Sequence, residues 1–349
     1  MAYRAAVLGG SGYAGAELLR LLAGHPEIEV ALVTADSNAG TAVADLYPSL
    51  ATAYEGLVFE RLMFESGAQA VAGLDLVFLT LPHGQSQAIA GSLVDTVGHV
   101  IDLGADFRLP QPEYEQWYGE THTAPDLIGR FTYGMTELYR PELADARHVA
   151  APGCYPTTAS LALAPLLAAG LVEPTGIVVD AVSGVSGAGR ALKATSLFAE
   201  VSDNVNAYGL LTHRHTAEME LALGHVAGQA VQVLFTPHLV PMSRGILATC
   251  YARPAVDGLD TASLLERYTA YYADEPFVVV SERPPSTKAT LGSNSVHLTV
   301  RYDERTNTVL AIGALDNLTK GASGQMLQDA NLLLDLPETL GLPTTGLMP

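Results

Sequence analysis

One of the two cysteines occupies a position at which a thiol could act as a nucleophile. Cys154 lies in the run APGCYPTT at positions 151–158, between a short apolar segment and a helical stretch. A thiol that opens a helix feels the unpaired N–H groups and the positive dipole end of the first turn, which favour the thiolate. A thiolate attacks carbonyl carbon, so this position suggests covalent acyl chemistry, although an isolated cysteine is more often a small buried hydrophobe.

Two histidines that flank an arginine form a second candidate group. His213, Arg214 and His215 precede another helical stretch. Imidazole titrates near neutral pH and suits general acid–base catalysis, whereas a guanidinium suits a carboxylate or a phosphate. Simple surface polarity is the alternative. No further cluster of ligands accompanies the two histidines in the sequence, so we predict no metal site.

A glycine-rich run near the N-terminus has the spacing of a dinucleotide-binding turn. Gly10, Gly12 and Gly15 follow the apolar run at positions 5–8 and open a helical pattern. Glycines at this spacing permit a tight turn and a close approach of the backbone to a pyrophosphate, whose charge the helix N-terminus meets. The residues predicted to bind a cofactor here are Gly10, Ser11, Gly12, Tyr13, Ala14 and Gly15.

The end of the second predicted strand bears on the choice between NAD and NADP. Asp36 stands where an acidic residue commonly binds the ribose 2′-OH of NAD. Ser37 and Asn38, which follow it, could accept the 2′-phosphate of NADP through a hydroxyl and an amide. These signals conflict, so this stretch alone leaves the cofactor choice open.

Two further turns follow predicted strands. The first, at positions 82–84, follows the apolar run at 74–80 and would lie at the carboxyl edge of a parallel sheet, where ligands bind. The second, at positions 183–190, offers the backbone N–H groups of glycines and serines to an anion and ends in an arginine. A plain turn is the alternative interpretation of each. The residues predicted to contact a ligand are Pro82, His83, Gly84, Ser186, Gly187 and Arg190.

The apolar segments that must position these residues predict an α/β fold. Continuous apolar runs at positions 5–8, 30–34, 74–80 and 100–103 alternate with helical or loop segments. This pattern is typical of a parallel sheet covered on both faces. Residues 1–150 are therefore predicted to form a Rossmann-type, doubly wound nucleotide-binding domain.

After position 154 the pattern of strands and helices changes. Few helical segments separate the later apolar or alternating runs, which suits a mixed, largely antiparallel sheet. We predict that residues 151–319 form an α+β catalytic and oligomerisation domain. The C-terminal helix, within residues 320–349, is predicted to return to the first domain. The strand-like runs of the second domain are 177–182, 231–236, 246–252, 295–302 and 309–315.

The composition excludes several classes of partner. The 349 residues include 37 acidic and 18 basic ones, and the net charge of −19 argues against a nucleic-acid or anionic-membrane surface, since both need basic patches. Two cysteines make no disulfide framework, and Cys250 lies in an apolar, strand-like run that indicates buried packing. No apolar run approaches the ~20 residues that cross a bilayer. The N-terminus has no signal-peptide pattern, so a cytoplasmic protein is expected.

Seven segments occur together and in order, and they carry a resemblance to a known family. The chain resembles the N-acetyl-gamma-glutamyl-phosphate reductases of arginine biosynthesis, within the superfamily of aspartate-semialdehyde and glyceraldehyde-phosphate dehydrogenases. The resemblance runs from the first predicted strand to the last helix. The segments are GGSGYAGAEL (9–18), LPHG (81–84), GADFRL (104–109), PGCYPT (152–157), SGVSGAGR (183–190), HRH (213–215) and DNLTKG (316–321).

This resemblance implies a reaction and assigns roles to residues. It implies that NADPH reduces N-acetyl-glutamyl 5-phosphate to N-acetyl-glutamate 5-semialdehyde and phosphate through a cysteinyl thioester. Cys154 would be the nucleophile and His215 the general acid–base, with His213 beside it. NADP is the cofactor that the resemblance implies, and Ser37 could accept its 2′-phosphate. The other residues that it implicates are Arg108 and Arg190, for the substrate phosphate or carboxylate, and Asn317, near the nicotinamide.

Two other functions remain open at this point. An aminoadipyl-phosphate reductase of lysine biosynthesis would share the chemistry, but it acts on a substrate attached to an acidic carrier protein and would need a basic docking surface. A nucleotide sensor without turnover would leave Cys154 and the two histidines unexplained. The partners predicted are a small-molecule substrate and further copies of the chain, because an extended sheet in a second domain often pairs to form a dimer or tetramer.

Overall fold

The chain folds into two compact units. The computed structural model describes residues 2–62 and 67–348. The first unit consists of Met1–Pro152 and Ala322–Leu342, and the second of Gly153–Gly321 and Pro343–Pro349. Among the described residues, no helix combines the length and the apolar character needed to cross a membrane.

The first unit is built on a sheet of seven parallel strands in the order β3-β2-β1-β4-β5-β7-β6. This sheet confirms the predicted Rossmann-type arrangement. The strands are β1 (Tyr3–Leu8), β2 (Ile28–Ala35), β3 (Glu60–Arg61), β4 (Leu76–Leu79), β5 (His99–Asp102), β6 (Phe131–Tyr133) and β7 (His148–Ala150).

Helices cover both faces of this parallel sheet. The four residues of β4 alternate between the two faces, and all of them are fully buried. Ile89 and Leu93 of α4 pack on one face in a single apolar cluster, and burying each such side chain contributes about 1.5–3 kcal/mol. The helices of this unit are α1 (Tyr13–Leu22), α2 (Val43–Leu46), α3 (Gly67–Ala70), α4 (Ser86–Leu93), α5 (Gln111–Tyr118), α6 (Thr136–Ala144), α11 (Gly324–Leu333) and the 3-10 turns η1 (Pro48–Leu50) and η3 (Pro125–Arg130).

The second unit contains a mixed sheet in the order β12-β13-β14-β11-β8-β10-β9. The β8–β10 and β12–β13 pairs are parallel, whereas β9–β10, β8–β11, β11–β14 and β13–β14 are antiparallel, as the predicted fold class requires. The strands are β8 (Ile177–Gly184), β9 (Asn206–Ala207), β10 (Val233–Val240), β11 (Ile246–Ala252), β12 (Val278–Val280), β13 (Val296–Asp303) and β14 (Thr308–Leu315).

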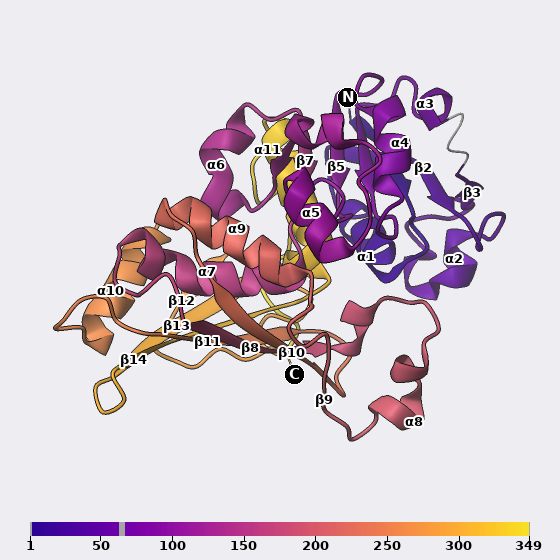
Figure 1. Ribbon diagram of the computed structural model, residues 1–349. Coiled ribbons are helices and arrows are strands. Elements are labelled where there is room, and N and C mark those ends of the chain that lie inside the picture. Colours follow the sequence, from indigo (N-terminus) through magenta and orange to yellow (C-terminus); the bar gives the residue numbers. More distant parts are fainter. Residues whose placement is uncertain (1, 63–66, 349) are drawn as a thin grey trace. The chain divides into compact units, whose positions relative to one another are not determined.

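One face of the mixed sheet is covered by α7, α9 and α10 (Figure 1). The backbone of α7 lies so close that a Cβ on Gly313 would come within 3.0 Å of the Thr158 carbonyl oxygen. Nearly every residue of α7 is buried, which is typical of a helix that is apolar all round. The helices here are α7 (Cys154–Ala168), α8 (Phe198–Val201), α9 (His215–Ala227), α10 (Thr261–Tyr271) and the short turns η4 (Val185–Ala188), η5 (Ala194–Ser196) and η6 (Thr319–Ser323).

Candidate active site

The structure places Cys154 at the first position of α7. Gly153 is the N-cap residue and has extended backbone angles, so the chain enters the helix directly at the cysteine. Cys154 is partly exposed, whereas Cys250, inside β11, is fully buried. Burial raises the pKa of the Cys250 thiol, which disfavours its thiolate. Of the two thiols, Cys154 is therefore the one suited to act as a nucleophile.

A buried carboxylate joins the start of α7 to α9. The backbone N–H of Gly153 donates to Oε1 of Glu218 at 2.6 Å, and Glu218 is 1% exposed. Glu218 lies three residues after His215 on α9, which places the two side chains on the same face of that helix. The sequence analysis did not single out Glu218. Its spacing from His215 predicts that the two share a helix face, but not the contact with Gly153.

The two predicted histidines lie together, but they differ in their surroundings. Nδ1 of His213 accepts the backbone N–H of His215 at 3.2 Å, and the two rings are 4.8 Å apart between centroids. Burial, together with the charges of His215 and Arg214, lowers the pKa of His213 to about 3, although Glu218 opposes this shift. His213 is therefore neutral across the physiological pH range.

An aromatic cluster brings both histidines next to the residue that follows Cys154. The Tyr155 ring lies 5.7 Å from that of His213 and 5.9 Å from that of His215, between centroids. The hydroxyl of Tyr208 donates to the hydroxyl of Tyr155 at 3.0 Å. Burial raises the pKa of Tyr208 to about 12, so this hydroxyl stays protonated. Phe235 closes the cluster at 5.1 Å from the Tyr155 ring.

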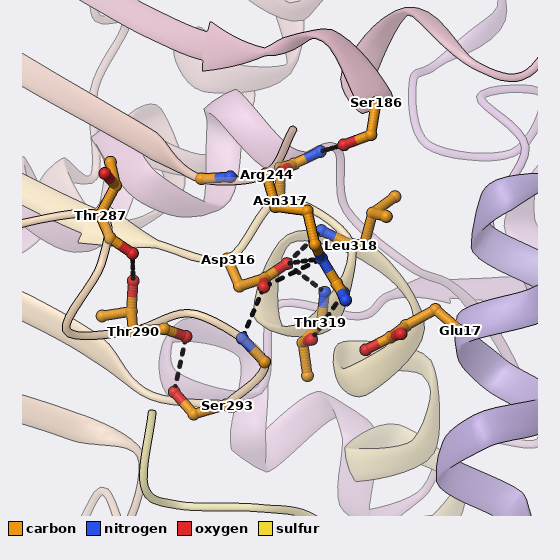
Figure 2. A network of polar contacts seen from close by, with 12 residues as sticks. Glu17, Ser186, Arg244, Thr287, Thr290, Ser293, Asp316, Asn317, Leu318 and Thr319 are labelled. Carbon is orange, nitrogen blue, oxygen red and sulfur yellow. Dashed lines mark hydrogen bonds and ion pairs between the residues drawn. The ribbon is translucent and has the colours of Figure 1, made fainter. Parts of the chain in front are cut away.

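The segment DNLTKG at positions 316–321 reaches the nucleophile position. A Cβ on Gly321 would lie 2.7 Å from the Cβ of Cys154, so only a glycine fits at this position. The segment is anchored by the fully buried carboxylate of Asp316. Asp316 pairs with the Arg244 guanidinium at 3.1 Å, and Figure 2 shows the surrounding contacts. The other groups that donate to Asp316 are the N–H groups of Gly292, Leu318 and Thr319, at 2.7, 2.9 and 3.1 Å.

Asn317 joins this segment to the predicted anion-binding turn. Its Oδ1 accepts the N–H of Gly245 at 2.7 Å, and its Nδ2 donates to Oγ of Ser186 at 2.9 Å (Figure 2). A Cβ on Gly187 would lie 2.8 Å from Oγ of Ser183, so the turn is packed closely at this point. Ser186, Gly187 and Asn317 therefore lie together in the second unit. Arg190 follows the turn and is exposed.

The glycine-rich turn of the first unit has the shape that a dinucleotide requires. A Cβ on Gly10 would lie 2.4 Å from Cγ2 of Val33, and one on Gly15 would lie 2.5 Å from Cα of Gly10. By contrast, a Cβ on Gly12 would have no atom closer than 3.8 Å. The turn is therefore closely packed at Gly10 and Gly15 but open at Gly12, where a pyrophosphate could approach the backbone. Ser11 belongs to the same turn, and Tyr13 and Ala14 begin α1.

The turn after β4 holds His83 between two carboxylates. Nδ1 of His83 lies 3.1 Å from Oδ1 of Asp106, and its Nε2 lies 3.6 Å from Oε2 of Glu120. The N–H of Gly84 donates to the same Oδ1 of Asp106 at 2.9 Å. Although burial acts to raise it, hydrogen bonds from His83, Gly84 and Gln87 keep the pKa of Asp106 below its ordinary value. The turn that contains Pro82 is thus held by an ionised carboxylate.

The two arginines proposed for the substrate lie in different units. Arg108 belongs to the first unit, is 8% exposed, and donates from Nη2 to the carbonyl oxygen of Leu103 at 2.6 Å. Arg190 belongs to the second unit. Ser37 lies exposed after β2, where Nδ2 of Asn38 donates to its Oγ at 3.4 Å. Across residues 2–62 and 67–348, no group of three acidic, histidine or cysteine side chains is placed to hold a metal ion.

Two family models match consecutive parts of the chain. The model described as "Semialdehyde dehydrogenase, NAD binding domain" matches residues 4–146. The model described as "Semialdehyde dehydrogenase, dimerisation domain" matches residues 154–317. The glycine-rich turn lies in the first match, and Cys154 and both histidines lie in the second.

Curated relatives match this chain over nearly its whole length. The N-acetyl-gamma-glutamyl-phosphate reductase of Symbiobacterium thermophilum is 49% identical over 352 residues, covering 99% of each chain. The reductase of that name from Acidothermus cellulolyticus is 47% identical over 355 residues, covering 100% of each chain. The one from Moorella thermoacetica is 45% identical over 352 residues and covers 99% of each.

Solved structures share the fold at low sequence identity. Aspartate semialdehyde dehydrogenase II of Vibrio cholerae, complexed with ASA, matches with a TM-score of 0.71 at 15% identity, over 96% of this chain and 99% of that chain. Aspartate semialdehyde dehydrogenase with NADP from Candida albicans matches with a TM-score of 0.64 at 16% identity and the same coverage. These similarities confirm the fold class predicted from the sequence.

Proposed function

This chain belongs to the N-acetyl-gamma-glutamyl-phosphate reductase family, and we propose that it reduces N-acetyl-glutamyl 5-phosphate to N-acetyl-glutamate 5-semialdehyde and phosphate. This is a step of arginine biosynthesis, and such an enzyme is expected to work in the cytoplasm. The observation that carries the proposal is that Cys154 opens α7 and that the next residue, Tyr155, contacts both histidine rings, in a chain 49% identical to a reductase of that name.

Cys154 would act as the nucleophile. Its thiolate Sγ attacks the acyl carbon, a C–S bond forms, and the bond from that carbon to the phosphate oxygen breaks as phosphate leaves. The product is a thioester on Cys154. The developing oxyanion needs donors that are already in place, and the backbone N–H of Cys154 at the start of α7 is one such donor.

His215 would move the proton in the second half-reaction. The bound nicotinamide supplies the hydride that reduces the thioester. His215 donates a proton to the oxygen of the resulting thiohemiacetal. It then takes that proton back as the C–S bond breaks, the thiolate leaves and the aldehyde is released. His213 is unsuited to this role because its pKa is lowered to about 3 and its Nδ1 accepts the His215 N–H.

The cofactor is a nicotinamide dinucleotide, and we propose that it is NADP. The shape of the glycine-rich turn supports binding of the pyrophosphate there, with the 2′-phosphate near Ser37. The backbone of the anion-binding turn and the Asn317 amide would face the nicotinamide end. Residues proposed to hold the cofactor are Gly10, Ser11, Gly12, Tyr13, Ala14, Gly15, Ser37, Pro82, His83, Gly84, Ser186, Gly187 and Asn317.

Two arginines and further copies of the chain complete the proposal. Arg108 and Arg190 would bind the phosphate or carboxylate groups of the substrate, because a guanidinium meets such anions with two parallel hydrogen bonds. The chain would form a dimer or tetramer through the mixed sheet. That sheet lies within the match to the model described as a dimerisation domain.

The reverse reaction tests the whole proposal in one assay. N-acetyl-glutamate semialdehyde, phosphate and NADP are supplied, and the absorbance of the reduced cofactor is followed. NAD and an aminoadipate semialdehyde serve as comparisons. Phosphate-dependent reduction of NADP with the acetyl-glutamyl aldehyde is expected. A preference for the aminoadipate aldehyde would move the chain to lysine biosynthesis, and no signal with either aldehyde despite tight NADP binding would favour the sensor.

A further inference from the structure

An arginine that the sequence motifs do not include lies at the end of β2. The short strand β3 pairs in parallel with β2, and this register sets Arg61 opposite Ala35, the last residue of β2. Nη1 of Arg61 lies 3.5 Å from Oδ1 of Asp36, the next residue of the chain. The fold thus places the Arg61 guanidinium beside Asp36. Asp36 is the acidic residue because of which the sequence did not decide between NAD and NADP.

The segment that carries Arg61 is tied to the glycine-rich turn. Phe59, two residues before Arg61, is fully buried, and its ring lies 3.3 Å from where a Cβ on Gly10 would be. Gly40 donates its N–H to the Phe59 carbonyl oxygen at 2.7 Å, and Phe59 donates to the Thr41 carbonyl oxygen at 2.9 Å. The loop after β2 is therefore held against residues 57–61. In an extended segment residues i and i+2 face the same side, so Arg61 projects to the side on which Phe59 meets the turn.

The charges at this site decide which cofactor it can accept. A 2′-phosphate brings about two negative charges to a chain whose net charge is already −19, so it needs a local cation. Asp36 alone would repel that phosphate and would favour the 2′-OH of NAD. Arg61 neutralises Asp36 in the present pair, and a guanidinium can bind phosphate with two parallel hydrogen bonds.

We propose that Arg61 is the residue that selects NADP over NAD. When the cofactor binds, Arg61 leaves Asp36 and binds the 2′-phosphate instead. The proposal rests on the proposed function, because it names a specificity residue of the same cofactor site. The exchange is feasible because the pair is solvent-exposed, with the Asp36 side chain 97% exposed and the Arg61 side chain 64% exposed. Such exposed ion pairs contribute little to stability, so little is lost when Arg61 leaves Asp36.

The test measures binding of nucleotide fragments rather than turnover. Titration calorimetry with 2′,5′-ADP and with 5′-AMP compares a ligand that carries the 2′-phosphate with one that lacks it. Arg61→Ala should weaken 2′,5′-ADP binding about 10- to 100-fold, the effect of losing a hydrogen-bonded charge partner, and leave 5′-AMP binding within about twofold. Asp36→Asn should leave 2′,5′-ADP binding unchanged or tighten it, because the repulsion is removed.

Arg305 supplies a matched control. It forms a similar exposed pair with Asp303, at 3.6 Å, in the turn between β13 and β14. Arg305→Ala should change neither titration. Should Arg61→Ala fold poorly, Arg61→Lys keeps a charge but loses the paired hydrogen bonds, and it should weaken 2′,5′-ADP binding by a smaller factor.

Three results would overturn the proposal: equal affinity of the wild type for the two fragments, an unchanged 2′,5′-ADP affinity in Arg61→Ala, or an equal loss for both fragments. The reductase assay separates this failure from failure of the proposed function. If the wild type forms the aldehyde but Arg61→Ala binds 2′,5′-ADP normally, the function stands and the specificity role fails. If the wild type forms no aldehyde while Arg61→Ala loses 2′,5′-ADP binding, the specificity role stands and the function fails.

Discussion

At the scale of single residues, the two thiols differ in the properties that govern reactivity. Cys154 is partly exposed and opens a helix, whereas Cys250 is buried inside a strand where its pKa is raised. We expect Cys154→Ala to abolish turnover, because no thioester can form, and to leave NADPH affinity intact. Cys250→Ala is the matched control and should retain most activity. Turnover near the wild-type rate in Cys154→Ala would exclude the covalent mechanism.

The histidine pair gives a second prediction at this scale. His215→Asn should lower kcat about 10²- to 10⁴-fold, the usual contribution of a general acid–base group. His213→Asn should have a much smaller effect, because His213 is already neutral at working pH, with a pKa of about 3. Steady-state kinetics of both variants with the same substrate and cofactor decide the matter. The reverse order of effects would assign the proton transfer to His213.

The residues proposed to carry the chemistry were chosen from the sequence, whereas the contacts that hold them come only from the structure. Cysteine and histidine types, with the glycine spacing, point to thiol, acid–base and nucleotide chemistry without a structure. Glu218 and Asp316 act through contacts to residues 65 and 72 positions away, Gly153 and Arg244. A carboxylate that accepts backbone N–H groups has no sequence pattern of its own, because any residue supplies the N–H.

At the scale of elements, Glu218 links the two helices that present the proposed catalytic groups. Glu218→Gln keeps the shape but removes the charge that accepts the Gly153 N–H at 2.6 Å. Loss of a hydrogen bond to a charged acceptor costs about 1.5–3 kcal/mol, so kcat should fall about 10- to 100-fold while the KM for NADPH is unchanged. Glu218 also opposes the lowering of the His213 pKa, but His213 is already neutral at working pH, so that effect should leave the pH–rate profile unchanged.

Glu220 provides the matched control for this prediction. It lies two residues further on α9 and accepts the N–H of Val233 at 3.0 Å, at the edge of the sheet rather than at the start of α7. Glu220→Gln should leave both kcat and the pH–rate profile unchanged. If Glu218→Gln loses thermal stability but keeps the wild-type kcat, its role is structural and the link between α7 and α9 does not position the catalytic groups.

A buried carboxyl at the end of β5 predicts a pH dependence of stability. Asp102 is fully buried and accepts from the Ser86 hydroxyl at 2.7 Å and the Gly104 N–H at 2.8 Å. Burial raises its pKa from 3.8 to about 7; Asp106 adds to the rise, while the hydrogen bonds and Arg108 oppose it. Between pH 3.8 and about pH 7 the folded chain holds a proton on Asp102 that the unfolded chain has released. The free energy of unfolding is therefore highest below this pH range and declines as the pH rises through it.

Asp102→Asn should remove this dependence. Between pH 5 and 8 the free energy of unfolding of the wild type should fall by about 1–4 kcal/mol relative to that of the variant, because each unit of difference between the folded and unfolded pKa is worth about 1.4 kcal/mol. Denaturant unfolding at several pH values measures it. The control is Asp95→Asn: the Arg130 hydrogen bond holds the pKa of Asp95 below its ordinary value, so this variant should keep the wild-type slope. A flat wild-type profile would contradict the prediction.

The predicted elements were most accurate where apolar runs are long. The run at 246–252 is β11 without a change at either end. Strands β3, β9 and β12 contain two or three residues, too few for a periodic signal, and the sequence analysis did not find them. The helix that Cys154 was predicted to open is α7, which begins at that residue, and Pro156 is tolerated because it falls in the first turn.

At the scale of the whole molecule, α7, α9 and α10 pack on one face of the mixed sheet, and its other, outer face carries exposed apolar side chains. On this outer face the registers set Leu234 and Tyr251 on either side of Val178, and Leu310 beside Tyr251. Leu234 is 50% exposed and Tyr251 is 40% exposed. Contiguous exposed apolar residues of this kind mark protein–protein contacts, so we predict that copies of the chain pair through this face. The sequence pattern of β10 and β11 shows the alternation but not which face the helices of the unit cover.

A charge placed on this outer face should therefore prevent assembly. Tyr251→Glu would put a carboxylate between Val178 and Leu310. The free energy needed to desolvate this carboxylate against a second copy exceeds the free energy gained from the apolar contact. The variant should elute as a monomer in size-exclusion chromatography with light scattering, while the wild type elutes as a dimer or tetramer. Tyr271→Glu is the control, because Tyr271 is 39% exposed but lies on α10. If Tyr251→Glu assembles like the wild type, the copies do not pair through this face.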